Sequence, residues 1–415
     1  MREMKDSGVA WIGEIPETWS INKMKYIGTY INGYAFKPDD WGNTGLPIIR
    51  IQDLTGSNNN PNYFNGNIDQ KYYVENGDIL VSWAATLDAF EWNKGEGWLN
   101  QHIFKAIPQK DIVSKPYYIW LLKVAMSYMN DDNKHGIMMQ HITLPVFNNF
   151  SIAIPSLEDQ QKIAAHLDRK CTQIDALISN AQQQIEKLKA YKQSVITETV
   201  TKGLNPDVAM KDSGVEWIGE IPEHWDAVPI RSLFRIKKDI IGHEPDTVLS
   251  ITQTGLKIKD ITENSGQMAN SYAHYQIVNV GDFAMNHMDL LTGGVGISEF
   301  EGVTSPDYRV FVMRNADMNS RYFLYVFQMY YRNKIFYAFG QGAANLGRWR
   351  LPAQNFNTVA VPLSPVEEQN SIVTFLDEKC TQIDKLIALK QQKIEKLQQY
   401  KKSLIYEYVT GKKEV

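Results

Sequence analysis

Side chains that can recognise nucleic acid gather in the loops of two stretches of the chain. Amide, imidazole, guanidinium and ammonium groups satisfy the donor and acceptor pattern of base edges or reach phosphates. In the first stretch, the candidates for DNA binding are Lys37, Ser82, Trp83, Asn100, Gln101, His102, Lys134, His135, Gln140 and His141. In the second stretch, they are Lys237, Lys238, Asn286, His287, Arg309, Gln341, Asn345, Arg348 and Arg350. Taken one at a time, each is more simply explained as a solvated loop residue. Whether they form a binding surface therefore depends on the elements that carry them.

Motifs typical of catalysis are missing from the sequence. It contains no GxxxxGK(S/T) phosphate loop and no GxGxxG motif after a predicted strand. The segment GVGIS at residues 294–298 lacks the Gly-x-Ser-x-Gly spacing of a nucleophile elbow. Cys171, Cys380 and the eight histidines form no cluster with zinc-ligand spacing. The sequence therefore predicts no catalytic residues and no metal site, and it favours a role in binding and assembly.

A duplicated framework carries the two stretches. MKDSGVAWIGEIPETW at residues 4–19 returns as MKDSGVEWIGEIPEHW at residues 210–225, with two differences. A second pair of matching blocks starts with CTQIDALI at Cys171 and CTQIDKLI at Cys380. Two units of about 200 residues are too few and too long for a solenoid. The repeat instead predicts two related positions that present different surfaces.

Between the repeated blocks, residues 20–154 and 226–361 show no comparable identity. Both inserts are predicted to be mixed α/β domains with one order: strands, an aromatic-rich helix, a glycine-containing loop and a last strand. Their formal charges are −1 (11 Lys and Arg, 12 Asp and Glu) and +1 (13 and 12). DNA-binding domains usually carry a basic surface. Any affinity for nucleic acid must therefore come from local clusters of charge, or from a partner that supplies phosphate contacts.

Several elements of the inserts are expected at defined places. In the first insert, residues 46–54 and 77–84 are predicted strands, and residues 114–129 are a predicted helix. In the second insert, residues 319–336 are the corresponding helix. Aromatic residues recur in these helices at helical spacing, which predicts core positions. The aromatic residues concerned are Tyr117, Tyr118, Trp120, Phe323, Tyr325 and Phe327.

Long helices are predicted to hold the inserts apart. Residues from about 157 to 202 lack proline and glycine and carry apolar side chains at heptad spacing, as does their repeat. A helix of roughly 44 residues would be ~65 Å long. Lys192 and Lys401 interrupt both seams at the same place, either as solvated positions or as docking points for other subunits. The coiled-coil seam is predicted to contain Leu167, Ile174, Ile178, Ile185, Leu188, Leu376, Ile383, Ile387, Ile394 and Leu397.

The lengths of the linkers predict a circular arrangement. Nine steps along the chain separate Thr201 from Met210. Nine steps also lead from Thr410 to Met4, if the chain is continued from its last residue to its first. Equal linkers predict a pseudo-twofold axis with neighbouring termini, and such an axis makes the two helices antiparallel.

The predicted fold class is therefore α+β, with two globular α/β domains separated by two long helices in an antiparallel coiled coil. The predicted division of the chain is 1–154 for the N-terminal segment and first α/β domain, 155–209 for the first helical segment, 210–361 for the repeated segment and second α/β domain, and 362–415 for the second helical segment.

These features together resemble the specificity subunit of type I restriction–modification systems. The resemblance covers the whole chain. It depends on DSGVEWIGEIPEHW before a variable domain and on PSLEDQ at Pro155 and PVEEQ at Pro365, which open the two helices. It implies that residues 20–154 and 226–361 are target recognition domains, each of which reads one half of a split DNA sequence. The coiled coil would then fix the length of the unread spacer.

The resemblance also implies partners and their cofactors. Family members bind double-stranded DNA and two methyltransferase (M) subunits, which use S-adenosylmethionine to methylate adenine. Restriction and translocation (R) subunits add ATP- and magnesium-dependent cleavage. This chain would then be a non-catalytic subunit that holds no cofactor of its own. No individual base-contacting residue is carried over, because the inserts diverge.

Two further expectations come from composition and from the rival hypothesis. The chain has no apolar run of about 18 residues and no signal peptide, which favours the cytoplasm. Its net charge of −4 and its near-neutral inserts leave an alternative, a non-catalytic protein–protein scaffold with two duplicated ligand-binding domains.

Overall fold

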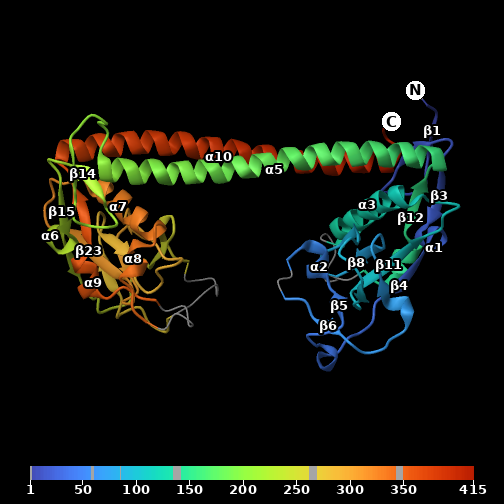
Figure 1. Cartoon of the computed structure of the whole chain (residues 1–415), viewed down its shortest axis with the longest axis horizontal. Helices are drawn as coiled ribbons and strands as arrows, with labels where there is room; N and C mark the ends of the chain where they lie inside the picture. Colours follow the sequence, from blue (N-terminus) through green and yellow to red (C-terminus); the bar gives the residue numbers. More distant parts are fainter. Residues whose placement is uncertain (1, 58–59, 85, 134–141, 261–268, 343–348) are drawn as a thin grey trace. The chain divides into compact units, whose positions relative to one another are not determined.

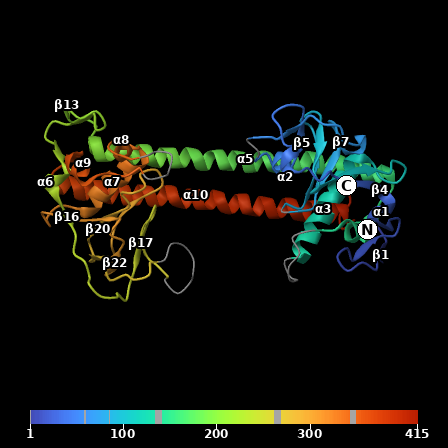
Figure 2. The same ribbon diagram turned by 90° about the horizontal axis from the view of Figure 1, so that it is seen from below.

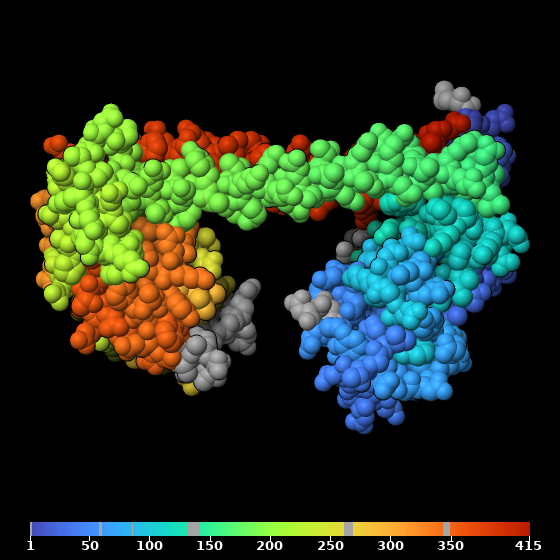
Figure 3. Space-filling model, viewed as in Figure 1, coloured from blue at the N-terminus to red at the C-terminus, as the bar shows by residue number. Residues whose placement is uncertain are grey.

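The chain folds into two compact units, each of which combines one insert with one end of both long helices (Figure 1). The computed structural model describes residues 2–57, 60–84, 86–133, 142–260, 269–342 and 349–415. Unit 1 consists of Met1–Gln182 and Gln392–Val415, and unit 2 of Gln183–Gln391. Figure 3 shows the surface of the first insert in blue to cyan and that of the second in yellow to orange. The boundaries of the units fall within the long helices, whereas the sequence-based division kept inserts and helices separate.

The long helices α5 (Leu157–Lys202) and α10 (Val366–Val409) run antiparallel within each unit (Figures 1 and 2). In unit 2, Lys192 pairs with Asp384, and Lys390 donates to Gln184, so residue numbers rise on one helix as they fall on the other. In unit 1, Lys401 of α10 pairs with Asp175 of α5, which fits the same antiparallel arrangement. The predicted antiparallel coiled coil is confirmed, and its helices have 46 and 44 residues.

Side chains along the predicted seam face inward. Of the ten seam residues, six are buried and four are half-buried. Lys192 and Lys401 interrupt the seam because each forms a salt bridge across the coil, of 2.7 Å to Asp384 and 2.6 Å to Asp175. The two lysines occupy equivalent positions of the repeat, and so do the two aspartates. Each copy thus supplies one lysine and one aspartate to a pair of register-setting contacts.

The first insert contains two four-stranded sheets and one long helix, α3 (Lys115–Asn133), which packs on β9. The first sheet has the order β4 (Gly28–Asn32), β11 (Ile103–Pro108), β8 (Ile79–Ser82) and β9 (Asp88–Glu91), all antiparallel. The second has the order β6 (Tyr63–Phe64), β5 (Leu46–Ile49), β10 (Gly97–Leu99) and β7 (Tyr73–Val74), with β5 and β10 parallel. Shorter elements are β1 (Met4–Asp6), β2 (Glu14–Pro16), β3 (Ser20–Lys23), β12 (Ser151–Ile154), α1 (Met24–Ile27), α2 (Ile51–Thr55), α4 (Leu144–Asn149), η1 (Pro38–Asp40) and η2 (Gln70–Tyr72).

The second insert repeats this topology, and its helix α7 (Ser320–Arg332) packs on β21. Its first sheet has the order β16 (Phe234–Lys237), β23 (Arg309–Met313), β20 (Phe283–Met285) and β21 (Val295–Ile297). A parallel bridge between Val248 and Val303 connects two strand pairs, β18–β17 and β22–β19. The resulting order, β18, β17, β22 and β19, corresponds to the order of the second sheet in the first insert. Those strands are β17 (Leu249–Thr252), β18 (Gly255–Ile258), β19 (Gln276–Val278) and β22 (Gly302–Thr304). Shorter elements are β13 (Met210–Asp212), β14 (Glu220–Pro222), β15 (Asp226–Pro229), β24 (Ala360–Leu363), α6 (Ile230–Leu233), α8 (Ile335–Ala338) and α9 (Ala353–Thr358).

The helices α3 and α7 lie between the first sheet of each insert and the long helices. Tyr117 donates to the Val409 carbonyl of α10 (3.2 Å), and Trp120 donates to Asp168 of α5 (2.8 Å). Tyr117, Tyr118, Trp120, Phe323 and Phe327 are buried, which confirms their predicted core positions. Tyr325 is half-buried, and its hydroxyl donates to Asp377. The main core of each insert is therefore shared by its helix, its first sheet and the long helices.

Two predicted elements are shorter than expected. The predicted strand 46–54 ends at Ile49. The Arg50 backbone N–H donates to the Asp53 carboxylate (2.8 Å), and this hydrogen bond caps the start of α2. The predicted helix 319–336 breaks at Lys334, whose φ of 58° is left-handed, before α8 begins. In both segments the backbone changes direction at polar residues, at Arg50 in the first and at Asn333 and Lys334 in the second.

The repeated motif at residues 4–19 and 210–225 closes the C-terminal end of a long helix. Gly411 after α10 has a φ of 75°, and a Cβ atom there would lie 2.6 Å from Pro16. Gly203 after α5 has a φ of 77° and lies against Trp225 in the same way. Arg2 also donates to the Gly411 carbonyl (2.8 Å), so the two termini are neighbours, as the linker lengths predicted.

A buried glutamine starts each long helix. The Gln160 side chain accepts from the Ser114 backbone N–H and donates to the carbonyls of Ile112 and Pro155. Gln369 accepts from the Asn319 backbone N–H and donates to the Ser364 carbonyl. These bonds tie the start of each long helix to the start of α3 or α7, which explains why PSLEDQ and PVEEQ share this residue.

Candidate nucleic-acid interface

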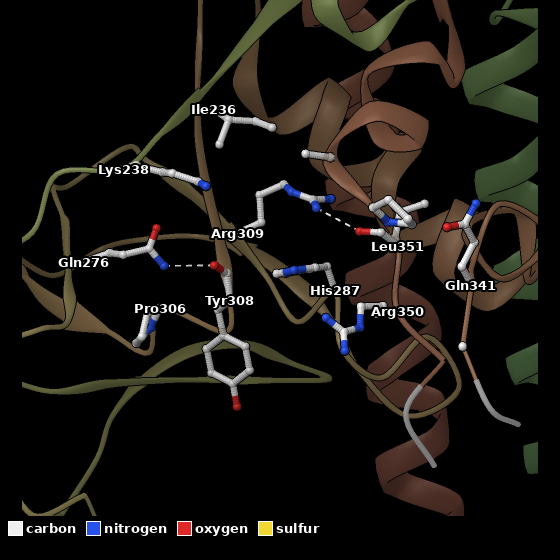
Figure 4. Close-up of a pocket in the computed structure, with 13 residues that line it drawn as sticks. Ile236, Lys238, Gln276, His287, Pro306, Tyr308, Arg309, Gln341, Arg350 and Leu351 are labelled. Carbon is white, nitrogen blue, oxygen red and sulfur yellow. Dashed lines mark hydrogen bonds between the residues drawn. The ribbon is translucent and has the colours of Figure 1, made fainter. Parts of the chain in front are cut away.

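A pocket of about 520 Å³ in unit 2 brings five of the predicted residues together (Figure 4). Lys238, His287, Arg309, Gln341 and Arg350 all line it. Sequence reasoning missed other lining residues, among them Gln276 and Tyr308. The Gln276 amide donates to the carbonyls of Ser305 and Tyr308 (2.9 Å each), which fixes the turn before β23.

Strand directions explain why these residues meet. β16 and β20 both run antiparallel to β23, so the C-terminal ends of β16 and β20 lie beside the N-terminal end of β23. Lys238 directly follows β16, His287 lies two residues after β20, and Arg309 is the first residue of β23. Arg350 reaches the same edge through an antiparallel bridge to Gln341. One edge of one sheet therefore gathers residues that are far apart in the sequence.

Arg309 forms the floor of the pocket and is 5% exposed. One guanidinium nitrogen, Nη2, donates to the Leu351 carbonyl (2.8 Å), and the group lies 4.8 Å from the centre of the Phe356 ring. The other nitrogen, Nη1, is buried and has no hydrogen-bond partner among the residues that the structure describes. Burial lowers the pKa of Arg309 to about 10, which leaves the group charged at neutral pH.

His287 lies beside this guanidinium as a neutral imidazole. Burial lowers its pKa to about 3, and the positive charges of Arg309, Arg350 and Lys238 act in the same direction. Its Nδ1 atom is also buried without a partner within the described part of the chain. The His287 carbonyl accepts from the Leu351 backbone N–H (2.8 Å), which fixes the residue at the sheet edge.

Lys238, Arg309 and Arg350 give the pocket three positive charges. None of its thirteen lining residues is acidic. Lys238, Gln341 and Arg350 are exposed at the rim. The neighbouring Lys237 differs, because it is 7% exposed and forms a 2.6 Å salt bridge with Asp282. Lys237 therefore holds the insert together and does not face solvent.

Asn286 also serves the fold. Its Oδ1 atom accepts from the backbone N–H groups of Met288 and Asp289 (3.2 Å each), and its carbonyl accepts from the Tyr331 hydroxyl (2.6 Å). These bonds shape the turn that places His287 in the pocket.

The first insert carries aromatic residues at the corresponding sheet edge. Phe104 of β11 contacts Phe147 of α4, and the ring centroids are 5.4 Å apart. Phe311 of β23 contacts Phe356 of α9 in the same way, at 5.1 Å. His102 precedes Phe104 by two residues, as Arg309 precedes Phe311. The Trp83 ring lies 5.3 Å from the exposed His102 ring and 6.1 Å from that of Phe104. The edge that holds a guanidinium in one insert thus holds an aromatic pair in the other.

The remaining described candidates of the first insert differ in exposure. Ser82 is fully buried in β8, and its hydroxyl donates to the Ala84 carbonyl, so it does not reach the surface of this structure. Asn100 and Gln101 are half-buried in the turn between β10 and β11, and Lys37 is exposed before η1. Six candidates lie outside the described residues, namely Lys134, His135, Gln140, His141, Asn345 and Arg348.

Across the described ranges, no group of three or more His, Cys, Asp and Glu side chains is placed to hold a metal ion. In those ranges, too, no helix has the length and apolar character needed to cross a membrane.

Comparison with known proteins agrees with the fold. Residues 16–188 and 222–399 match the sequence profile of the type I restriction modification DNA specificity domain. The EcoBI specificity subunit of Escherichia coli is 23% identical over 407 residues, which cover 91% of this chain and 82% of that protein. The putative MjaX specificity subunit of Methanocaldococcus jannaschii is 25% identical over 433 positions, which cover 97% and 95%.

Among solved structures, a chain from a study of complex assembly and conformational transition of the type I R-M system has a TM-score of 0.68. It is 12% identical, with 95% of this chain and 98% of that chain covered, so the likeness concerns the fold. The two profile matches each contain one insert together with part of the long helix that follows it. The chain therefore belongs to the family of type I restriction modification DNA specificity domains, of which it carries two copies.

Proposed function

We propose that each insert reads one half of a split DNA sequence and that the long helices set the number of unread base pairs between the halves. The observation that carries this proposal is the contrast at one sheet edge. Trp83 and His102 occupy it in the first insert, while His287 and Arg309 occupy it in the second. Two related domains with different chemistry at the same place are what a target with two unlike halves requires.

The proposed DNA-contacting residues are the described candidates that reach the surface or line the pocket. They are Trp83, Asn100, Gln101, His102 and Lys37 in the first insert, and Lys238, His287, Arg309, Gln341 and Arg350 in the second. The proposed functional division keeps residues 1–154 and 210–361 as recognition segments and residues 155–209 and 362–415 as spacers.

The repeated motif supports a role for its surface in assembly. The carboxylates of Asp6 and Glu14 are exposed, as are those of Asp212 and Glu220 at the equivalent positions. A nearly identical surface presented twice fits two copies of one partner. We assign these surfaces and the exposed faces of the helices to two methyltransferase subunits, with restriction subunits joining the same complex.

Cofactors in this proposal belong to the partners. S-adenosylmethionine would be bound by the methyltransferase subunits, and ATP and magnesium by the restriction subunits. The complex would act on DNA in the cytoplasm. This chain would contribute sequence recognition and spacing.

Exchange of residues 20–154 for the same region of a relative tests the proposal. Genome-wide mapping of methylated adenine should show a change in one half of the target, while the other half and the spacer length stay the same. Exchange of residues 226–361 should change only the other half. If neither exchange alters the methylated sequence, the proposal is wrong.

A further inference from the structure

We propose that the pocket at the edge of β16, β23 and β20 binds a phosphate group, which in the assembled complex is a backbone phosphate of DNA. This inference rests on the proposed function, because the phosphate belongs to the duplex that the second insert reads. A pocket for free phosphate would have the same chemistry, and the experiment below separates the two sources.

Unbalanced positive charge is the first argument. Lys238, Arg309 and Arg350 line one pocket that has no acidic lining residue. The neighbouring Lys237 forms a salt bridge with Asp282 and therefore adds no net charge to the pocket. Arg309 is the buried member of the three, and a buried charge is normally paired, because burial without a counter-charge is costly. An anion from outside the chain would supply the missing partner.

Unused donors on the pocket floor are the second argument. Arg309 is 95% buried, and its Nη1 atom has no partner among the described residues, although Nη2 is held by the Leu351 carbonyl. The Phe356 ring beneath the group restricts it further. The buried Nδ1 atom of His287 also has no partner in the same part of the structure, and it is a donor in the tautomer that carries the proton there. Fixed donors that converge on one space suit the oxygen atoms of a phosphate.

The number of charges favours a phosphate over a base edge. The edge of a base pair is neutral and offers a mixture of donors and acceptors. Such an edge would leave three cations in one pocket without compensation. A phosphate carries negative charge and offers only acceptor oxygens, which the side chains of Lys238, Arg309 and Arg350 match.

The first insert is not built in this way. Its corresponding position carries His102, whose neighbour is the Trp83 ring, and the Trp83 Nε1 atom already donates to Asn32 (3.2 Å). The contribution of this sheet edge to salt-dependent binding should therefore come from the second insert.

The test is the affinity of the full-length chain, in complex with its methyltransferase partner, for duplex DNA at several salt concentrations. Lys238→Gln with Arg350→Gln removes the two exposed cations and leaves Arg309 in the core. Arg235→Gln is the matched control, because Arg235 is exposed one residue before Ile236 on β16 and points to the other face of the strand. We expect the double variant to lose about tenfold in affinity, equally for target and non-target duplexes. The slope of log K against log salt should become shallower by about 0.9, which corresponds to one phosphate.

Three outcomes would overturn the inference or part of it. Normal sequence-specific binding with an unchanged salt slope in the double variant rejects the pocket and leaves the proposed function intact. A loss confined to target duplexes assigns the two residues to base recognition. Absence of sequence-specific binding by the unaltered complex rejects the proposed function itself.

A second measurement separates the two sources of phosphate. The His287 ring signal is followed by NMR in the full-length chain with labelled histidine, and the variant His287→Gln identifies it. Duplex DNA should shift this signal at micromolar concentration. A shift caused by inorganic phosphate, together with unchanged DNA affinity of the double variant, assigns the pocket to free phosphate and overturns the DNA contact. No shift with either probe rejects a phosphate site.

Discussion

The two inserts share a sheet but differ at the edge where its strands end. In the first insert, Trp83 and His102 form an aromatic pair there, and in the second, Arg309 lies on the Phe356 ring with Lys238 and Arg350 around it. Both sheets have the same strand order and antiparallel pairing. The strands thus fix where the edge lies, while the residues directly before or after them are free to change its chemistry.

The framework of repeated motifs and long helices, in contrast, has the same chemistry in both copies. The seam, the glutamines that open the long helices and the salt bridges across the coil occur in both copies. Equivalent substitutions should therefore have matching effects in the framework and unequal effects in the inserts. The following experiments test this contrast, from the largest expected effect to the smallest.

Removal of a seam side chain should cost most, and equally in both copies. Leu167 and Leu376 are equivalent and fully buried. Leu167→Ala and Leu376→Ala should each lower the free energy of unfolding by about 2–5 kcal/mol, because each leaves a cavity. Leu177 and Leu386 are the matched controls, since they are equivalent positions that are 48% and 47% exposed. Their alanine variants should change stability by less than about 0.5 kcal/mol in urea unfolding. A large loss in only one copy would contradict an equivalent framework.

Much of this framework was predictable from the sequence, because a heptad repeat and a duplicated motif are local patterns. The equal spacing of nine steps in each linker also predicted neighbouring termini, which Arg2 and Gly411 now show. The chemistry of the sheet edge was harder to predict. Lys237 and Lys238 are adjacent in sequence, and only the fold shows that Asp282 neutralises the first of them.

Burial and strand pairing also decide which side chains line the pocket. Ser82 was a candidate within the predicted strand 77–84, but all four residues of β8 are buried, since its two faces are both covered. Gln276 and Tyr308 carry no motif, and they reach the pocket through strand pairing between distant segments. Contacts of this kind depend on tertiary packing, which periodicity does not describe.

Substitution of the two buried glutamines should give the next largest loss of stability, with a small difference between the two copies. Gln160→Ala removes three hydrogen bonds, and Gln369→Ala removes two. Each variant leaves backbone groups without partners, so each should lose about 1–3 kcal/mol, with the greater loss at Gln160. Thermal unfolding measures the difference, and Gln161→Ala, at an exposed neighbour, is the control. Wild-type stability of either variant would show that these bonds are replaced by solvent.

The pH dependence of stability should reveal a difference between the inserts. The pKa of His287 is about 3 in the folded chain, below the usual value near 6.5 for an unfolded histidine. Between these values the unfolded state binds the extra proton, so the stability present above pH 6.5 is lost as the pH falls towards 3. At pH 5.5 the loss should be about 1.4 kcal/mol. His287→Gln should flatten the profile of unfolding free energy from about pH 6.5 to 4. An unaltered profile would mean that His287 is protonated in the folded chain.

The salt bridges across the coil should have the smallest effect and show the framework's equivalence most directly. Lys401→Glu and Lys192→Glu each place two carboxylates together where the structure has a salt bridge. Because Asp175 and Asp384 are 56% and 57% exposed, solvent screens the charges, and each loss should be about 0.5 kcal/mol at low salt. Adding Asp175→Lys or Asp384→Lys, respectively, should restore the stability by reversing the pair. Chemical unfolding at two salt concentrations measures both steps. If reversal rescues one pair and not the other, the two ends of the coil are held in register by different contacts.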